Sequence, residues 1–154
     1  AIILVGRTGV GKSTLAPLLA AALNCTSFDV DDELRDLPPY EAPTIEMRRN
    51  IILNMISLSP VVIAGGLEDF SEEIMNDEIK NSSLSIWISA KTEGRSVRTI
   101  PVHTKFYTLT QKEQDQIFST ADISIDISDL SVPDASHILI ERVKRAIDEE
   151  NPFI

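Results

Sequence analysis

Cysteine is almost absent from this sequence of 154 residues, and that scarcity excludes a class of proteins. Cys25 is the only cysteine, so the chain cannot form an internal disulfide, and no histidine lies near it in sequence to share a metal. Disulfide-stapled secreted scaffolds and cysteine-based zinc sites are therefore excluded. We expect a reducing compartment and predict a cytoplasmic location.

Long apolar runs and positive charge are also scarce. No apolar stretch reaches the roughly 18 residues that a membrane helix needs, and no signal peptide is visible before the first predicted strand. Lysine and arginine number 14 against 24 aspartate and glutamate, which gives a net charge of −10. The basic clusters at 48–49 and 142–145 are short, so we expect neither membrane nor nucleic-acid partners. A few well-placed cations can still bind a small anionic molecule.

A glycine-rich segment stands out near the start of the chain, Gly6-Arg7-Thr8-Gly9-Val10-Gly11-Lys12-Ser13-Thr14. It matches G-x-x-x-x-G-K-[ST], the P-loop pattern, and it has a predicted buried strand at 1–5 before it and a predicted helix after it. The glycines let successive amide groups point at phosphate oxygens, and the helix N-terminus adds partial positive charge. Lys12 would then reach the β- and γ-phosphates, and Ser13 would offer its hydroxyl to Mg²⁺. The segment predicts a site for ATP with Mg²⁺, and the strand before it and the helix after it make a chance match rarer.

The helix after this segment carries an apolar stripe with the spacing i, i+3, i+4, i+7 and i+8. Its members are Leu15, Leu18, Leu19, Ala22 and Leu23. Pro17 lies inside the helix and predicts a slight bend, and Asn24 is expected to end it. Residues 25–30 then predict a short second strand.

Carboxylates gather where that strand ends, at Asp29, Asp31, Asp32 and Glu33. They fit a solvated turn or a helix N-terminus, which favours negative charge. They also fit a functional pair, because Asp29 and Asp31 would point to the same side of an extended chain. Beside a P-loop, one carboxylate could hold a water of Mg²⁺ while the other accepts a proton from a substrate hydroxyl. Both interpretations stay open here.

The middle of the chain predicts a helix and then strands. Thr44 is expected to cap a helix, and Arg48 and Arg49 lie off its apolar stripe, where arginines are usually solvated. The buried positions predicted for this helix are Met47, Ile51, Ile52, Met55 and Ile56. Residues 60–64 predict an apolar strand ending in Gly65-Gly66, where a ligand could approach the backbone closely.

Further strands are predicted at 84–89 and 122–127, and Pro133 is expected to start a closing helix. The inward-facing positions of that helix are Leu139, Val143, Ala146 and Ile147. Strands that alternate with helices predict an α/β fold of three layers, a parallel sheet with helices on both faces. We predict one domain over 1–154.

The stretch 91–110 is polar, and we expect it to form a short lid. Arg95 and Arg98 are its candidate phosphate-binding residues, and His103 is expected on the surface. A short helix is predicted over 109–119.

Taken in order, these motifs resemble those of shikimate kinases. The matching segments are Gly6 to Thr14, Asp29-x-Asp31, Met47-Arg48, Val61 to Gly66, and the lead into the last strand at 117–126. The resemblance covers essentially the whole chain. Its P-loop is shared by many kinases, whereas the Asp-x-Asp and Gly-Gly segments together are more specific. It implies a P-loop kinase fold and, within aromatic amino acid biosynthesis, transfer of the γ-phosphoryl group of ATP to the 3-hydroxyl of shikimate.

The resemblance also implies roles for the matched residues. Lys12 would act on the phosphates, Asp29 would help hold Mg²⁺ through water, and Asp31 would orient or deprotonate the hydroxyl. Arg48 would pair with the substrate carboxylate. Gly65 and Gly66 would line the substrate pocket. Arg95 or Arg98, in the lid, would close over the phosphates.

Three positions depart from the family pattern. Leu67 stands where the family has a third glycine. Gln114 aligns with a substrate-clamping arginine, and a glutamine cannot offer a carboxylate the charged fork of a guanidinium. Ile51 stands where an acidic residue is expected one turn after Arg48. The stretch between Asp31 and Arg48 is also short for a substrate-binding segment, and the lid is short as well.

Two functional classes therefore stay open. The first is an ATP-dependent kinase for a small anionic metabolite, with shikimate as the first candidate and another hydroxyl acceptor as the second. The second is a weakly active or inactive shikimate-kinase-like domain used for binding or regulation, as in fungal quinate-pathway repressors, which Leu67 and Gln114 favour. A GTPase is not expected, because no Asn-Lys-x-Asp motif is present. The expected partner is a small molecule, and the domain could be part of a longer multidomain chain.

Overall fold

The structure is a computed structural model that describes residues 1–6, 11–35, 43–71, 73–89 and 121–149. Several predictions on single residues lie outside this part of the chain. They concern Arg7, Thr8, Gly9, Val10, Arg95, Arg98, His103 and Gln114. The predicted lid and the predicted helix over 109–119 lie outside it as well.

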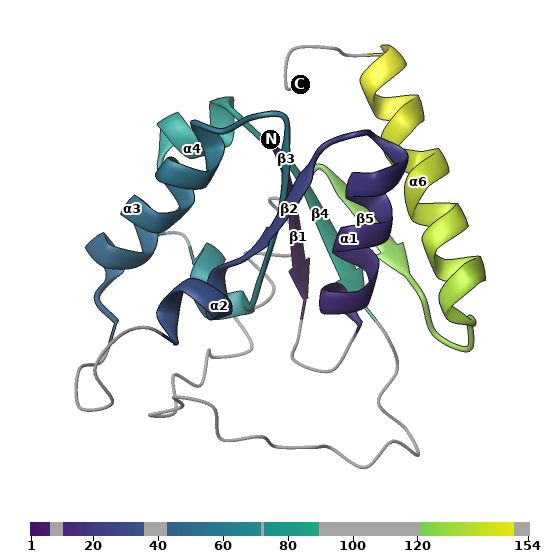
Figure 1. Cartoon of the computed structure of the whole chain (residues 1–154), viewed down its shortest axis with the longest axis horizontal. Coiled ribbons are helices and arrows are strands. Elements are labelled where there is room, and N and C mark those ends of the chain that lie inside the picture. The colour runs from purple at the N-terminus through teal and green to yellow at the C-terminus, as the bar shows by residue number, and fades with distance from the viewer. Residues whose placement is uncertain (7–10, 36–42, 72, 90–120, 150–154) are drawn as a thin grey trace.

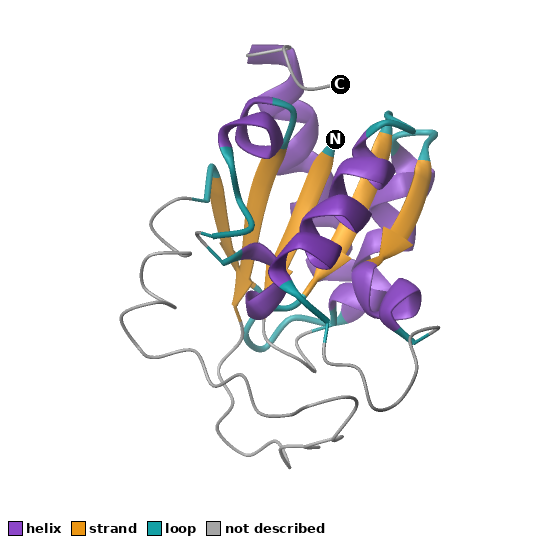
Figure 2. Ribbon diagram, turned by 90° about the vertical axis from the view of Figure 1, so that its left-hand side faces the viewer, coloured by secondary structure: helices purple, strands orange, loops and turns teal. Residues whose placement is uncertain are grey.

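Five parallel strands form one sheet in the order β2-β3-β1-β4-β5. The strands are β1 (Ile2–Gly6), β2 (Thr26–Asp29), β3 (Val61–Gly65), β4 (Leu84–Ser89) and β5 (Ile123–Asp126). In Figure 2 they lie side by side with helices in front and behind. The three inner strands are apolar and buried almost throughout, as expected when both faces of a parallel sheet are covered. The predicted parallel α/β fold is confirmed.

Helices cover the sheet on both sides. They are α1 (Lys12–Ala22), α2 (Val30–Leu34), α3 (Ile45–Ile56), the 3₁₀ helix η1 (Leu67–Phe70), α4 (Asp77–Asn81) and α6 (Val132–Glu149). Figure 1 shows α1 and α6 on one side of the sheet and α3 and α4 on the other. Because side chains alternate along a strand, Ile2 and Leu4 pack with α1 and α6, whereas Ile3 and Val5 pack with α2, α3 and α4.

The apolar stripe predicted for α1 is wrong in phase. Leu15 and Leu19 are buried as expected, but Leu18 is 41% exposed and Ala22 is also exposed. The positions that pack against the sheet instead include Ala16 and Ala20. In α3, similarly, only Ile52 and Met55 of the five predicted positions are fully buried; Met47, Ile51 and Ile56 are half-buried. In both helices one side packs against the core, and the residues at the edges of the predicted stripe are partly exposed to solvent.

Other local predictions agree with the structure within a residue or two. The Thr44 hydroxyl caps α3 by accepting a hydrogen bond from the backbone N–H of Met47 at 3.1 Å. Helix α1 contains Pro17 and ends at Ala22, and Asn24 follows in a left-handed conformation with φ 57°. The short elements η1 and α4 are not predicted from the sequence. Among the described residues, no helix is both long and apolar enough to cross a membrane.

Candidate functional site

The candidate site lies at the carboxyl edge of the sheet, where neighbouring strands β1 and β3 send the chain to opposite faces. From β1 the chain passes to α1 on one face, and from β3 it passes to η1, whose Phe70 is buried on the other. Such a divergence opens a crevice above the strand ends, which is the usual ligand position in parallel α/β sheets. Gly6, Asp29 and Gly65 end their strands at this edge.

Gly11 and Lys12 set the geometry of the phosphate-binding segment. Gly11 has φ 108°, and its carbonyl oxygen accepts hydrogen bonds from the N–H groups of Thr14 and Leu15, which starts α1. A Cβ at Gly11 would meet no atom within 4 Å, so backbone conformation rather than space requires glycine here. The N-terminus of α1, with Ser13 in its first turn, therefore lies at the strand edge and favours anions. The Lys12 ammonium donates a hydrogen bond to the Gly6 carbonyl oxygen at the end of β1.

The two aspartates adopt a different local geometry from the one expected. Asp29 is the N-cap of α2, and its Oδ1 accepts a hydrogen bond from the Asp31 N–H at 2.9 Å. Asp31 thus lies in the first turn of a helix, and the extended chain assumed for the pair is wrong. An aspartate cap satisfies a free helix amide, and the following carboxylates favour the positive end of the helix. The helix-N-terminus interpretation describes the local structure, and a role in catalysis stays a prediction.

Charged groups from α2 and from the P-loop segment act on the carboxyl group of Asp29. Burial raises the pKa of the Asp29 carboxyl above its ordinary value of 3.8, and the carboxylates of Asp31 and Asp32 act in the same direction. The Asp31 N–H and the Lys12 ammonium oppose this increase, without cancelling it. Lys12 is the one cation among the groups that shift this pKa. A further cation at this carboxylate would compensate a charge that burial disfavours.

The oxygen donors at this edge fit Mg²⁺. Among the described residues, no three His, Cys, Asp or Glu side chains gather closely enough to hold a metal by themselves. Mg²⁺ does not need such a cage, because one or two protein oxygens together with nucleotide phosphates and water complete its octahedron. The Asp29 carboxylate and the Ser13 hydroxyl are donors of this kind.

Arg48 has a buried partner that the sequence did not reveal. Its Nη1 forms an ion pair with Oδ1 of Asp69, whose side chain is 0% exposed against 17% for Arg48. The other oxygen of Asp69 accepts a hydrogen bond from the Gly66 N–H at 2.9 Å. The carboxylate beside Arg48 thus comes from η1 and not from position 51 of α3. No local pattern in the sequence marks this pair, because Gly66 has no side chain with which to complete a capping box with Asp69.

Arg49 donates hydrogen bonds to the backbone of the chain that follows η1. Its Nη2 donates a hydrogen bond to the carbonyl oxygen of Glu73, and its Nε lies 3.5 Å from the carbonyl oxygen of Ile74. Neither arginine of α3 is simply solvated. Together they tie this helix to the chain that follows β3.

Gly65 makes room for side chains of the protein itself. A Cβ at this position would lie 2.6 Å from Cε2 of Phe70 and 3.1 Å from Oδ2 of Asp69. The first distance is shorter than real Cβ contacts, and the second is tight, so Asp69 would have to shift by a few tenths of an ångström. We expected the glycines to admit a ligand, and the structure shows that Gly65 first admits Phe70 and Asp69. A substrate contact for Gly65 and Gly66 stays a prediction.

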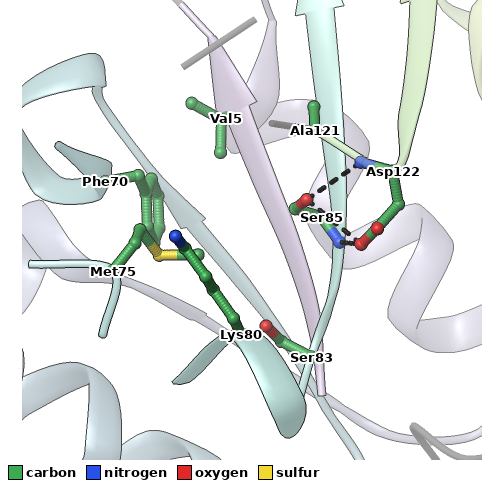
Figure 3. A pocket seen from close by; sticks show the side chains of 8 residues that line it. All are labelled: Val5, Phe70, Met75, Lys80, Ser83, Ser85, Ala121 and Asp122. Carbon is green, nitrogen blue, oxygen red and sulfur yellow. Dashed lines mark hydrogen bonds between the residues drawn. The ribbon is translucent and has the colours of Figure 1, made fainter. Parts of the chain in front are cut away.

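A separate pocket of about 300 Å³ lies on the face of the sheet that carries α4 (Figure 3). Its lining comprises Val5, Phe70, Met75, Lys80, Ser83, Ser85, Ala121 and Asp122. Ser85 and Asp122 bond to each other on one wall, with the Ser85 N–H 2.9 Å from Oδ2 of Asp122. None of the predicted site residues lines this pocket, so it is not the predicted site.

Comparisons with known proteins find relatives in sequence and in fold. No protein-family model matches the chain. It is 29% identical over 151 residues to a shikimate kinase from Bradyrhizobium diazoefficiens, an alignment that covers 84% of this chain and 72% of the relative. It is 33% identical over 109 residues to a shikimate kinase from Paramagnetospirillum magneticum, covering 64% of this chain and 56% of that one. The chain thus spans little more than half the length of this second relative.

Solved structures show the same fold. Shikimate kinase from Aquifex aeolicus superimposes with a TM-score of 0.67 at 22% identity, over 95% of this chain and 98% of that one. Shikimate kinase from Acinetobacter baumannii in complex with shikimate gives 0.67 at 19% identity, over 97% and 93% of the two chains. A gluconokinase from Sinorhizobium meliloti gives 0.55 at 13% identity, over 98% and 97%.

The chain resembles shikimate kinases in sequence and fold. Its low identity marks this shikimate-kinase-like P-loop protein as divergent, as the departures at Ile51 and Leu67 indicate. The predicted resemblance and the predicted P-loop kinase fold are confirmed.

Proposed function

We propose that this shikimate-kinase-like chain transfers the γ-phosphoryl group of ATP to a hydroxyl of a small anionic metabolite, with the 3-hydroxyl of shikimate as the first candidate. The observation that carries the proposal is the placement of Lys12 and Asp29 at the same carboxyl edge, after β1 and β2, with the Gly65 end of β3 between them. The cation that would bind phosphate and the acidic residues that would serve Mg²⁺ and a hydroxyl thus follow strands that end at one edge of the sheet. The curated relatives named shikimate kinase support the choice of acceptor.

Nucleotide binding would rest on the segment from Gly6 to Thr14. Amides at the N-terminus of α1 and the Lys12 ammonium would hold the phosphates, and the Ser13 hydroxyl with Asp29, through water, would hold Mg²⁺. The bound Mg²⁺ would neutralise charge that develops on the phosphate oxygens. Arg95 and Arg98 remain candidates for contacts to the transferred group.

Acceptor binding would rest on α2 and α3. Asp31, in the first turn of α2, would orient the acceptor hydroxyl and take its proton. Arg48 would bind the carboxylate of the acceptor with the N–H groups that Asp69 does not use. Gly65 and Gly66 would form the floor between them.

A second candidate function is binding without turnover, as a regulatory domain. It is favoured by Gln114 and Leu67, because both replace residues of the family's substrate site. A third is phosphoryl transfer to another small hydroxyl compound. For either kinase candidate we propose one domain over 1–154 acting in the cytoplasm without nucleic-acid or membrane partners, alone or within a longer chain.

A coupled assay of ADP release across shikimate, quinate, gluconate and nucleoside monophosphates tests the proposal. We expect acceptor-dependent ADP with a hydroxy acid. Asp31→Asn should lower kcat by roughly 10²–10⁴ and leave nucleotide affinity near normal, because only the hydroxyl contact is lost. Asp29→Asn should instead raise the Mg²⁺ concentration that ADP release requires. Equal, mild effects of both substitutions would support the interpretation of the aspartates as a solvated helix N-terminus without a role in the reaction. Nucleotide binding without ADP release would favour the regulatory candidate.

A further inference from the structure

We propose that Asp69 is the positioning residue of Arg48, and that it replaces, from η1, the acidic residue that would stand at Ile51 of α3. The inference rests on the proposed function in one respect, since it takes Arg48 as the residue that binds the acceptor carboxylate. It adds to that function a device that sets where this arginine points.

The two oxygens of Asp69 have different partners. Oδ1 pairs with Nη1 of Arg48, and Oδ2 accepts the Gly66 N–H at 2.9 Å. The carboxylate is fully buried, and a buried carboxylate without a cation is strongly unfavourable. Arg48 therefore cannot turn away without breaking its ion pair with this buried carboxylate. The pair fixes the arginine to the backbone at the end of β3.

The position of Asp69 is itself fixed by packing. Phe70, the next residue, is buried in the core at 3% exposure, and Gly65 leaves just enough space for both side chains. Arg49 binds the carbonyl oxygen of Glu73 a few residues later. Helix α3 and the chain after β3 are thus joined at two points, one of which runs through the proposed acceptor-binding arginine.

The geometry leaves a recognition edge on Arg48. Nη1 is used by Asp69, whereas Nε and Nη2 form no hydrogen bond to any residue that the structure describes. Donors on these two nitrogens are coplanar, and such an edge matches the two oxygens of a carboxylate. Asp69 would therefore act by orientation, and removing its charge should weaken binding of an anionic acceptor even though the net positive charge near Arg48 increases.

Steady-state kinetics on four proteins test this: the wild type, Asp69→Asn, and Asp69→Asn combined with Ile51→Glu or with Ile51→Gln. An asparagine can still accept the Gly66 N–H, but its amide nitrogen then faces the guanidinium, so Arg48 loses its acceptor. We expect Asp69→Asn to raise the KM for the acceptor roughly ten- to a hundredfold and to leave the KM for ATP unchanged. Ile51→Glu should restore much of this loss because it lies one turn from Arg48, and the matched Ile51→Gln should not. An acceptor KM that is unchanged or lower in Asp69→Asn would overturn the proposal.

A second readout is independent of turnover. In ¹⁵N NMR of the wild type, the Arg48 side-chain N–H groups should exchange slowly with water, as expected for a guanidinium held by a buried carboxylate. Rapid exchange in the wild type would overturn the positioning role even if Asp69→Asn does not fold. Slow exchange in a wild type without acceptor-dependent ADP release would instead uphold the pair and reject only the proposed function.

Discussion

Asp29 combines two demands in a single side chain. As the N-cap of α2 it must accept the Asp31 N–H, and as the proposed Mg²⁺-binding residue it must stay ionised at the strand edge. Burial and the neighbouring carboxylates raise its pKa, so the ionised form is less favourable in the folded chain than in the unfolded chain. Keeping Asp29 charged thus costs stability in the free protein.

The expected pH dependence follows from the direction of this shift. A carboxyl whose pKa is raised by folding lowers the free energy of unfolding above that pKa, and the loss disappears as pH falls to about 3.8 and below, where both states are protonated. Asp29→Asn keeps a capping oxygen and removes the charge. We predict that it is at least as stable as the wild type at pH 7 and that the difference shrinks towards pH 4, measured by urea unfolding without nucleotide.

Asp29→Ala is the matched control for that experiment. It removes the cap as well as the charge, so it should be less stable than Asp29→Asn by about 0.5–2 kcal/mol. A loss of stability in Asp29→Asn that grows as pH rises from 4 to 7 would show that the charge stabilises the fold, contrary to the pKa direction.

At the scale of elements, α1 shows what apolar spacing can and cannot predict. The existence of the helix, its start after Gly11 and its inner Pro17 follow from local residues. The buried face does not, because leucines and alanines occur on nearly every side of this helix and several stripes satisfy the same spacing. Contact with the sheet selects Ala16 and Ala20 over Leu18 and Ala22.

Two adjacent leucines of α1 provide a direct check. Leu19 is 0% exposed and Leu18 is 41% exposed. We predict that Leu19→Ala lowers the free energy of unfolding by about 2–5 kcal/mol, because it leaves a cavity in the core. Leu18→Ala should change it by no more than about 0.5 kcal/mol, as expected for a surface position. Chemical denaturation of both variants is the measurement, and equal losses would support the stripe expected from sequence rather than the observed packing.

At the scale of the whole molecule, the predictable part of the fold is the part that is coded locally. Apolar strands alternating with helices indicate a parallel three-layer sheet, and the P-loop marks its first turn. The Arg48–Asp69 pair was not found because its members are 21 residues apart and lie on elements that only the fold brings together. The carboxylates after Asp29 fit a helix N-terminus as well as an extended chain, and only the structure shows that Asp31 lies in the first turn of the five-residue helix α2. The contacts of the site that the sequence does not predict are those between residues that are distant in the chain.

Isothermal titration calorimetry with Mg·ATP and Mg·ADP tests the central claim, a nucleotide-phosphate site at the carboxyl edge, most directly. We predict binding of both nucleotides by the wild type, with an increase in melting temperature that follows from mass action. Lys12→Ala should weaken ATP more than ADP because it removes the contact to the γ-phosphate. Lys80→Ala, which changes an exposed lysine of α4 outside the site, should leave both affinities unchanged. An absence of heat from the wild type at millimolar nucleotide would contradict the phosphate site and the kinase function built on it.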